Sequence, residues 1–194
     1  MLGRTLKWVE DRREHCLTAV QERDQFWSLE IAVEADGRIR GLRGSLIHDQ
    51  GAYALKAVNL PYNSATAVPG PYMVPALDMR VIITFTNKVP ASSVRGAGYP
   101  QAAFAMERLM DLVAQRLGLD RAEVRRRNLI PPEKMPYTKP LKARSGAPVT
   151  YDSGDYIASQ KEALEAAGWD EFRERQLAAR KEGRYIGIGL ANAV

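Results

Sequence analysis

The sequence predicts an α+β fold in which an antiparallel or mixed sheet, built around a β-hairpin, carries helices packed on one face. Three patterns support this: alternating apolar residues over 26–35, an Asp36-Gly37 turn directly after them, and helically spaced apolar residues over 102–117. The chain has 194 residues, 45% of them hydrophobic and 26% charged, as in ordinary soluble globular proteins. That length allows a domain with a substantial core.

The hairpin is the first well-defined element. In the segment 26–35 four large apolar residues share one face of a strand, namely Trp27, Leu29, Ile31 and Val33. Asp36-Gly37 is a typical hairpin turn, and residues 39–48 supply the returning strand. Before the hairpin, Leu6 and Trp8 favour a short strand over 4–9.

A loop-rich passage and a second strand follow. Four prolines between Gly51 and Pro75 argue against a central strand or a long helix there. The apolar run 81–85 predicts a buried strand, and the helix over 102–117 is expected to end at Gly118.

The remaining elements are predicted from capping residues. Asp120 is expected to cap a short helix that runs to about Asn128, and the prolines between 131 and 140 predict an irregular crossing. Two further helices are expected to end near Gly168 and at Gly183, with Asp152 or Ser153 capping the first and Asp170 the second. Residues 184–194 predict a strand, and a chain that both opens and closes in strands suggests a fragment.

Charge and cysteine content narrow the functional classes. The formal net charge is +5, but basic and acidic residues alternate, which indicates a solvated surface more than a nucleic-acid site. The single cysteine, Cys16, excludes an internal disulfide and any cysteine-based cluster within the chain, and it fits a reducing, cytoplasmic setting. No apolar run approaches the roughly 20 residues that span a bilayer.

The segment 86–101 holds the main candidate site. It lies between the predicted strand and helix and contains Arg95, Gly96, Ala97, Gly98 and Gln101, with Pro100 suited to the first helical turn. Glycines allow positive φ and close approach of another molecule, and free N–H groups at a helix start favour an anion or a metal-bound oxygen. A tight turn with packing glycines explains the same pattern, so the two interpretations stay open on spacing alone.

Several segments, in order, resemble one enzyme family. Residues 3–14 are similar to "GRPVKW…DRRE", residues 87–101 to "TN.P…RGxGxPQ", and residues 123–129 to "EVRRRNL". Residues 51–53, 106–108 and 151–154 fit as well. Together they resemble the large, molybdenum-binding subunit of the xanthine dehydrogenase, aldehyde oxidase and aerobic carbon monoxide dehydrogenase family.

The resemblance implies a molybdopterin cytosine dinucleotide site and partner subunits that carry 2Fe-2S clusters and FAD. It implies that Arg95, Gly96, Ala97, Gly98 and Gln101 bind the cofactor, and that the small-molecule substrate is an aldehyde or an N-heterocycle. No residue is assigned as catalytic or as a metal ligand. The family's catalytic glutamate near the subunit's C-terminus and its upstream "GGGFG" segment have no counterpart here, so we expect no catalysis by this chain alone.

Departures from the family pattern bear on the substrate. Gly96 stands where carbon monoxide dehydrogenases carry a copper-binding cysteine, which makes carbon monoxide the less favoured substrate. Ala97 stands where xanthine oxidases carry an aromatic residue, and Asn63 falls near the position of their xanthine-orienting arginine. Purine specificity is therefore not expected.

Other charged and titratable residues are interpreted as structural. His15 and His48 have no partners at ligand spacing, and Glu14, Glu107 and Glu123 have no carboxylate partner for acid–base work. The run 125–127 of three arginines is expected on a solvated or subunit-facing surface.

Two hypotheses follow. The first is a central piece of a molybdenum hydroxylase large subunit, with a molybdopterin-binding-type domain over 1–150 and a helical segment over 151–194 that leads by a strand into a further domain. The second is a non-catalytic partner-binding domain from a truncated reading frame. Neither needs a nucleic-acid partner or a membrane span.

Overall fold

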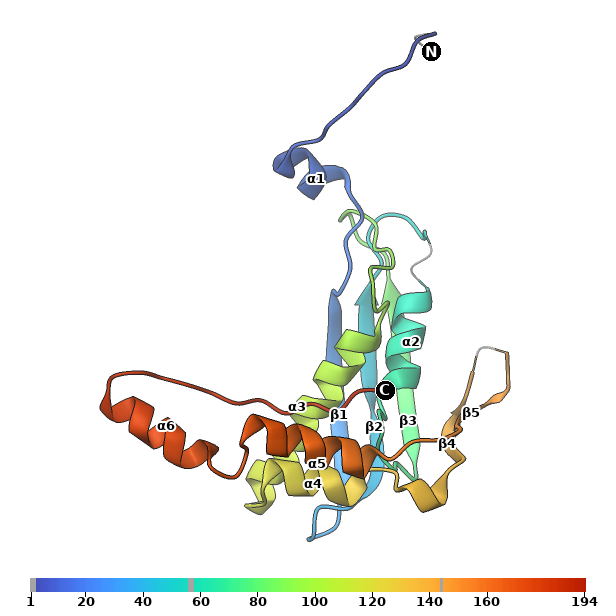
Figure 1. Cartoon of the computed structure of the whole chain (residues 1–194). Coiled ribbons are helices and arrows are strands. Elements are labelled where there is room, and N and C mark those ends of the chain that lie inside the picture. Colours follow the sequence, from blue (N-terminus) through green and yellow to red (C-terminus); the bar gives the residue numbers. More distant parts are fainter. Residues whose placement is uncertain (1–2, 56–57, 144) are drawn as a thin grey trace.

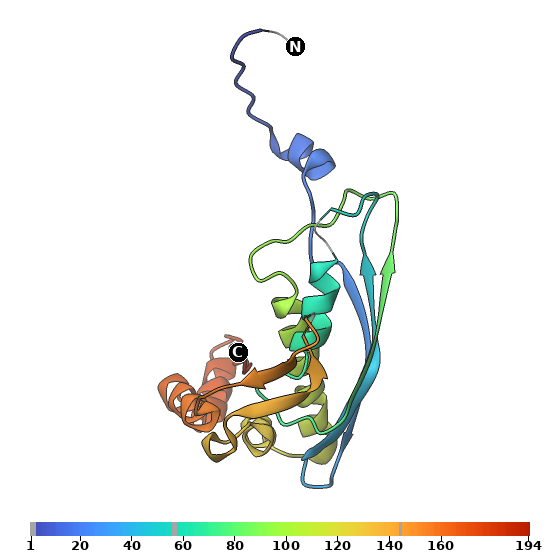
Figure 2. The same cartoon turned by 90° about the vertical axis from the view of Figure 1, so that its right-hand side faces the viewer.

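The computed structural model describes residues 3–55, 58–143 and 145–194. A mixed sheet forms one layer, and helices form a second layer on one of its faces (Figures 1 and 2). In chain order the elements are α1 (Arg12–Thr18), β1 (Gln25–Val33), β2 (Ile39–Asp49), α2 (Asn59–Ala67), β3 (Leu77–Thr84), α3 (Tyr99–Leu117), α4 (Arg121–Asn128), η1 (Pro132–Lys134), β4 (Tyr137–Lys142), β5 (Pro148–Tyr151), α5 (Tyr156–Ala167) and α6 (Phe172–Lys181).

The sheet has the order β1-β2-β3, with β1 antiparallel and β3 parallel to β2. The hairpin turn is the predicted one: Gly37 has φ 86°, and its N–H donates to the Glu34 carbonyl at 2.9 Å. The parallel pairing of β2 and β3 needs a crossover connection, which α2 provides. The predicted α+β fold with a mixed sheet around this hairpin and helices on one face is therefore confirmed.

The main core lies between the inner face of the sheet and α3. The four alternating residues of β1 predicted to share a face are half-buried and pack against this core. From α3, the buried side chains Met106, Met110 and Val113 face them. Burial of each such side chain stabilises the fold by about 1.5–3 kcal/mol. This packing holds α3 on the sheet and so fixes the position of its first turn.

Helix α2 lies in the passage for which the prolines predicted loops. Pro61 is its third residue and therefore lies in the first turn, where a backbone N–H has no helical partner to lose. The proline count thus ruled out a long helix correctly but missed this nine-residue one.

The strand predicted over 4–9 is wrong: residues 5–10 have no regular structure, and α1 follows them. Asp11 and Glu14 form a capping box at its start, with the Glu14 N–H donating to Asp11 Oδ1 at 2.8 Å and the Asp11 N–H to Glu14 Oε2 at 3.0 Å. Local hydrogen bonds determine the conformation here, because residues 5–10 pair with no strand in the described ranges of the chain.

Two other predictions differ from the structure. The proline-rich crossing contains the hairpin β4–β5, in which Pro140 lies within a two-stranded ladder that tolerates its missing N–H. Residues 184–194 form no strand in the described part of the chain and run as an irregular segment over α4, α5 and α6. An extended sequence becomes a strand only beside a partner strand, and this segment has none among the described residues.

The helix ends mostly follow the prediction. Gly118 and Gly168 are left-handed C-caps, and Asp120 accepts hydrogen bonds from the N–H groups of Ala122 and Glu123. The caps of the last two helices are Asp155 and Glu171, one to three residues after those predicted.

Candidate functional site

The segment 94–101 connects β3 to α3 as a tight double turn. Gly96 and Gly98 have φ values of 99° and 100°, and Ala97 between them has 34°. The Ala97 N–H donates to the Val94 carbonyl at 2.8 Å, and the Tyr99 N–H donates to the Gly96 carbonyl at 2.8 Å. Pro100 lies in the first turn of α3, so the predicted order of strand, glycine loop and helix is confirmed.

Helix α2 holds one side of this loop. Asn63 Nδ2 donates to the Ala97 carbonyl at 2.9 Å, and Ser64 Oγ donates to the Gly98 carbonyl at 3.0 Å. Gly98 is buried, and a Cβ on it would lie 2.4 Å from the Leu60 carbonyl oxygen. Gly98 is therefore a packing glycine.

Residues before β1 hold the other side of the loop. Arg23 Nη2 donates to the Arg95 carbonyl at 3.0 Å, and Arg23 Nη1 lies 3.4 Å from Gln101 Oε1. Gln101 Nε2 in turn lies 3.4 Å from Glu22 Oε1. The loop is thus fixed from both sides.

The five predicted site residues do not share one surface. Gly96 is exposed, its N–H has no hydrogen-bond partner among the described residues, and it lines a cavity of about 570 Å³. Other residues around this cavity include Asn63, Tyr99, Met106, Glu107, Tyr151 and Asn192. Gln101 lines a separate cavity of about 550 Å³ beside β1, while the Arg95 side chain is exposed. The structure brings Arg95 to Gly98 together and turns the Gln101 side chain away from Gly96.

A group of buried polar side chains lies at the end of the sheet nearest this loop. We call Glu22, Gln25, His48 and Gln50 the loop-side residues; among the described residues, one or more side-chain atoms of each has no hydrogen-bond partner. Gln25 and His48 are opposite each other in the β1–β2 ladder, and Gln25 lines the same cavity as Gln101. Burial lowers the pKa of His48, which keeps its ring neutral despite Asp49 and Asp24 nearby.

Unpaired buried polar atoms and an exposed main-chain N–H are the donors and acceptors that a polar cofactor with several oxygens requires. In this chemical sense the residues around the loop fit a pterin-type cofactor. Within residues 3–55, 58–143 and 145–194 no cluster of three or more His, Cys, Asp or Glu side chains could hold a metal ion.

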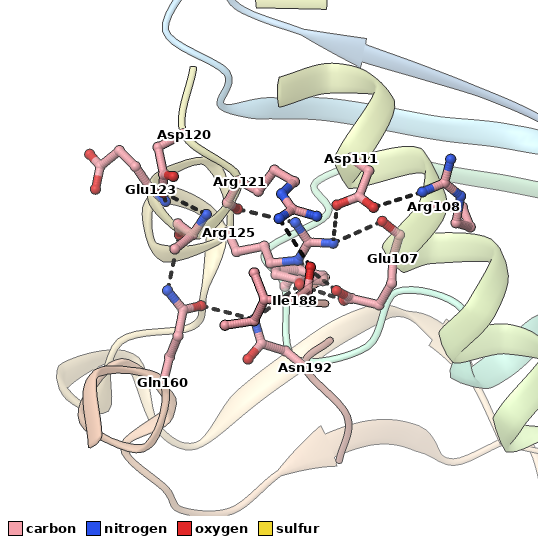
Figure 3. Close-up of polar contacts among 12 residues, drawn as sticks. Glu107, Arg108, Asp111, Asp120, Arg121, Glu123, Arg125, Gln160, Ile188 and Asn192 are labelled. Atoms are coloured by element: carbon pink, nitrogen blue, oxygen red, sulfur yellow. Dashed lines mark hydrogen bonds and ion pairs between the residues drawn. The ribbon is translucent and has the colours of Figure 1, made fainter. Parts of the chain in front are cut away.

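The most extensive buried polar network was not predicted. Arg125 is fully buried, and its Nε donates to Glu107 Oε2 at 2.6 Å while its Nη2 donates to Asp111 Oδ1 at 2.9 Å and to the Glu107 carbonyl. Glu107 Oε1 accepts from the Tyr72 hydroxyl at 2.5 Å. Figure 3 shows Arg125 lying between α3 and α4 with Glu107 and Asp111 pointing toward it.

The expectation that all three arginines of 125–127 lie on a surface is therefore wrong for Arg125. Arg126 is exposed and Arg127 half-buried, and both pair with Glu123. The available sequence signal was the pair of carboxylates four residues apart on one helix, Glu107 and Asp111, which share a face and need a cation when buried.

Lys139 is a second buried cation, with a different environment. It is 3% exposed, its Nζ donates to the Gly70 carbonyl, and it lies 4.2 Å from the centroid of the Tyr151 ring. Burial lowers the pKa of Lys139 to about 7. Among the described residues no carboxylate pairs with it.

The remaining predicted residues are structural. His48 is in the interior, whereas His15 lies at the surface, where it pairs with Glu10 at 2.6 Å. Cys16 is exposed. Within the described residues, no helix is both long enough and apolar enough to cross a membrane.

Comparisons with known proteins agree with the resemblance drawn from the motifs. A sequence family described as the molybdopterin cofactor-binding domain matches residues 1–129. The gamma subunit of the 6-hydroxypseudooxynicotine dehydrogenase complex of Paenarthrobacter nicotinovorans is 40% identical over 190 residues, which are 97% of this chain and 24% of that protein. The carbon monoxide dehydrogenase large chain of Hydrogenophaga pseudoflava is 34% identical over 98% of this chain and 24% of its own length.

Solved structures with a similar fold also include an oxidoreductase. Quinoline 2-oxidoreductase from Pseudomonas putida 86 superposes with a TM-score of 0.83 and 34% identity, covering 95% of this chain and 23% of that one. The chain thus spans about a quarter of the length of these relatives.

Proposed function

We propose, because this chain belongs to the molybdopterin cofactor-binding domain family, that it forms part of a molybdenum hydroxylase large subunit and supplies residues 94–98 to the cofactor site. The observation that carries this proposal is the exposed N–H of Gly96 at the border of a cavity, which has no partner among the residues that the structure describes. Amides presented this way bind oxygens that carry negative charge.

The roles of the five predicted residues differ within this proposal. Gly96 offers its N–H, Ala97 and Gly98 give the turn its shape, and Arg95 places a positive charge at the loop surface. Gln101 is held by Glu22 and Arg23, so we propose that it supports the loop from behind and contacts the cofactor only through the cavity beside β1.

When bound, the cofactor supplies hydroxylation of an aldehyde or an N-heterocycle with oxygen from water. The relative named for quinoline favours an N-heterocycle, and Gly96 in place of a copper-binding cysteine makes carbon monoxide the less favoured substrate. We further propose the cytosine dinucleotide form of the cofactor, partner subunits with 2Fe-2S clusters and FAD, and a cytoplasmic setting. No acid–base residue is assigned, so the chain alone is expected to be inactive.

The test is Gly96→Val in the complete large subunit, produced with its partner subunits. A Cβ at position 96 would lie 2.9 Å from Pro100 Cγ, and φ of 99° disfavours any L side chain, so the loop has to move. We expect at least a tenfold loss of molybdenum-dependent turnover together with lower molybdenum and pterin content.

Gly41→Ala is the control, because φ at Gly41 is not positive and a Cβ built there makes only ordinary contacts, at 3.5 Å from Ala76. It should keep both turnover and cofactor. Wild-type turnover and cofactor content in Gly96→Val would show that the loop has no part in the site.

A further inference from the structure

The buried network around Arg125 continues into a closed ring. The Tyr72 hydroxyl, which donates to Glu107, accepts from Asn192 Nδ2 at 3.2 Å. Asn192 Nδ2 also donates to Gln160 Oε1 at 2.9 Å, and Gln160 Nε2 donates to the Ala122 carbonyl of α4 at 3.0 Å. Ala122 and Arg125 both belong to α4, so the helix backbone closes the series of contacts that began at Arg125. We call these residues, Glu107, Arg125, Tyr72, Asn192, Gln160 and Ala122, the polar ring.

Apart from the partly exposed Asn192, the polar ring is buried, and its charges are balanced. The Arg125 and Arg108 guanidinium groups face the Glu107 and Asp111 carboxylates, with Arg108 Nη1 2.8 Å from Asp111 Oδ2. Burial and the Glu107 carboxylate raise the pKa of Tyr72, so its hydroxyl stays protonated and remains a donor. Buried networks of this kind fix geometry, because a broken member leaves its neighbours unpaired without access to water.

Asn192 belongs to the irregular segment after α6, which we call the strap (residues 186–194). Side chains of the helices hold its backbone: Gln176 Nε2 donates to the Ile186 carbonyl at 3.0 Å, and Arg121 Nη2 to the Ile188 carbonyl at 3.3 Å. Figure 3 shows Asn192 and Gln160 pointing toward each other beneath Arg125 and Glu107. Without strand pairing, the position of the strap depends on these side-chain contacts.

The end of the strap lines the cavity that Gly96 also lines. Asn192, Ala193 and Val194 contribute to its wall, and so does Glu107 of the polar ring. The same ring of hydrogen bonds therefore contacts the cavity directly through Glu107 and indirectly through the strap.

We propose that Tyr72, Glu107 and Gln160 are positioning residues that hold the strap as a fixed wall of the Gly96 cavity and thereby set which ligands fit. The position of the strap follows from this chain alone. Only the identity of the cavity as a substrate site rests on the proposed function.

The first test is Tyr72→Phe in the full chain, read by hydrogen exchange. The variant keeps the aromatic ring and removes the hydroxyl that joins Glu107 to Asn192. We expect the backbone amides of the strap to exchange at least tenfold faster while those of β1 and β2 are unchanged. Tyr53→Phe is the matched control, since Tyr53 is 69% exposed and its hydroxyl has no partner among the described residues.

If Tyr72→Phe impairs folding, Asn192→Leu tests the same link from the partly exposed strap side. Unchanged strap exchange in these variants, or an equal increase over the whole chain, would overturn the proposal, because the ring would then contribute only general stability.

The second test uses Tyr72→Phe in the complete subunit with its partners and quinoline, an N-heterocycle, as the substrate. We expect molybdenum content and kcat to stay within twofold of the wild type and KM to rise at least fivefold. An unchanged KM, with looser strap amides, would show that the strap does not shape the substrate cavity. If instead Gly96→Val is fully active while Tyr72→Phe loosens the strap, the proposed function fails and the positioning of the strap stands.

Discussion

The polar ring and the loop-side residues are two buried polar regions of one small domain, and they differ in completeness. In the ring, every side chain from Arg125 to Gln160 has at least one hydrogen-bond partner at 2.5–3.2 Å. Among the loop-side residues, both ring nitrogens of His48, both amide atoms of Gln25 and one oxygen of Gln50 have no hydrogen-bond partner within the described residues, and Glu22 Oε2 has only an ion-pair contact with Arg23 Nε at 3.3 Å.

The difference indicates which buried polar groups find their hydrogen-bond partners within the domain itself. Native proteins pair nearly all buried polar groups, because each unpaired one costs about 1–3 kcal/mol. The side chains of the polar ring find their hydrogen-bond partners within this chain, so the ring is part of the stable fold. The loop-side residues do not, and they lie next to the loop proposed to bind a cofactor.

The largest expected effect comes from removing the cation of the ring. Arg125→Met leaves the buried Glu107 carboxylate without its cation, while Asp111 keeps Arg108, and an unpaired buried carboxylate typically destabilises a protein by about 3–5 kcal/mol. Denaturation of the chain with urea measures this loss.

Arg126→Met, on the same helix, is the control. Its ion pair with Glu123 is half exposed, so its loss should cost less than about 1 kcal/mol. Equal effects of the two substitutions would show that the ring is not a distinct structural unit.

A smaller effect is expected from the unpaired buried cation. Because the pKa of Lys139 falls to about 7 in the folded state, the unfolded state binds an extra proton between that pH and the ordinary lysine value near 10.5. The free energy of unfolding should therefore rise with pH in this window, by up to about 1.4 kcal/mol per pH unit.

Lys139→Met should remove this part of the pH dependence, as measured by urea denaturation at pH 7, 8 and 9. The same slope in both proteins would mean that Lys139 keeps its proton and that the Gly70 carbonyl and the Tyr151 ring compensate for its burial.

The smallest expected effect compares one substitution in the two regions. Gln160→Met breaks two hydrogen bonds of the ring and should cost about 1–2 kcal/mol of unfolding free energy. Gln25→Met removes two unpaired atoms and should be neutral or stabilise the chain by up to about 1 kcal/mol. Thermal denaturation of the two variants measures this difference. A larger loss of unfolding free energy in Gln25→Met than in Gln160→Met would contradict the comparison.

The elements of the fold that depend on local signals were predictable. In the hairpin 26–48, β1 alternates strictly and a strong turn follows it, and α3 has helical spacing between Pro100 and a capping Gly118. The α2 helix, the β4–β5 hairpin and the irregular strap depend on tertiary neighbours, which outweigh their prolines or their strand-forming composition. The division into domains at residue 150 stays a prediction.

The candidate site was predictable only in part. Glycine spacing identified the loop, and the ordered motifs identified the family. The sequence could not show that the Gln101 side chain turns away from Gly96 or that Arg125 is buried. The spacing of residues does not say which side of a helix each side chain occupies in the folded chain. The loop-side residues had no sequence signal at all, since Gln25 and His48 meet only through strand pairing.

The two glycines of the loop both belong to the pattern "RGxG", but different constraints act on them. Position 98 has no room for more than a hydrogen atom beneath the Leu60 carbonyl, whatever the protein binds. Position 96 meets only the ring of a neighbouring proline and otherwise faces solvent. A relative that lost its cofactor would therefore be able to change position 96 by rearranging the turn and replacing the proline at position 100, whereas a change at position 98 would require α2 to move away as well.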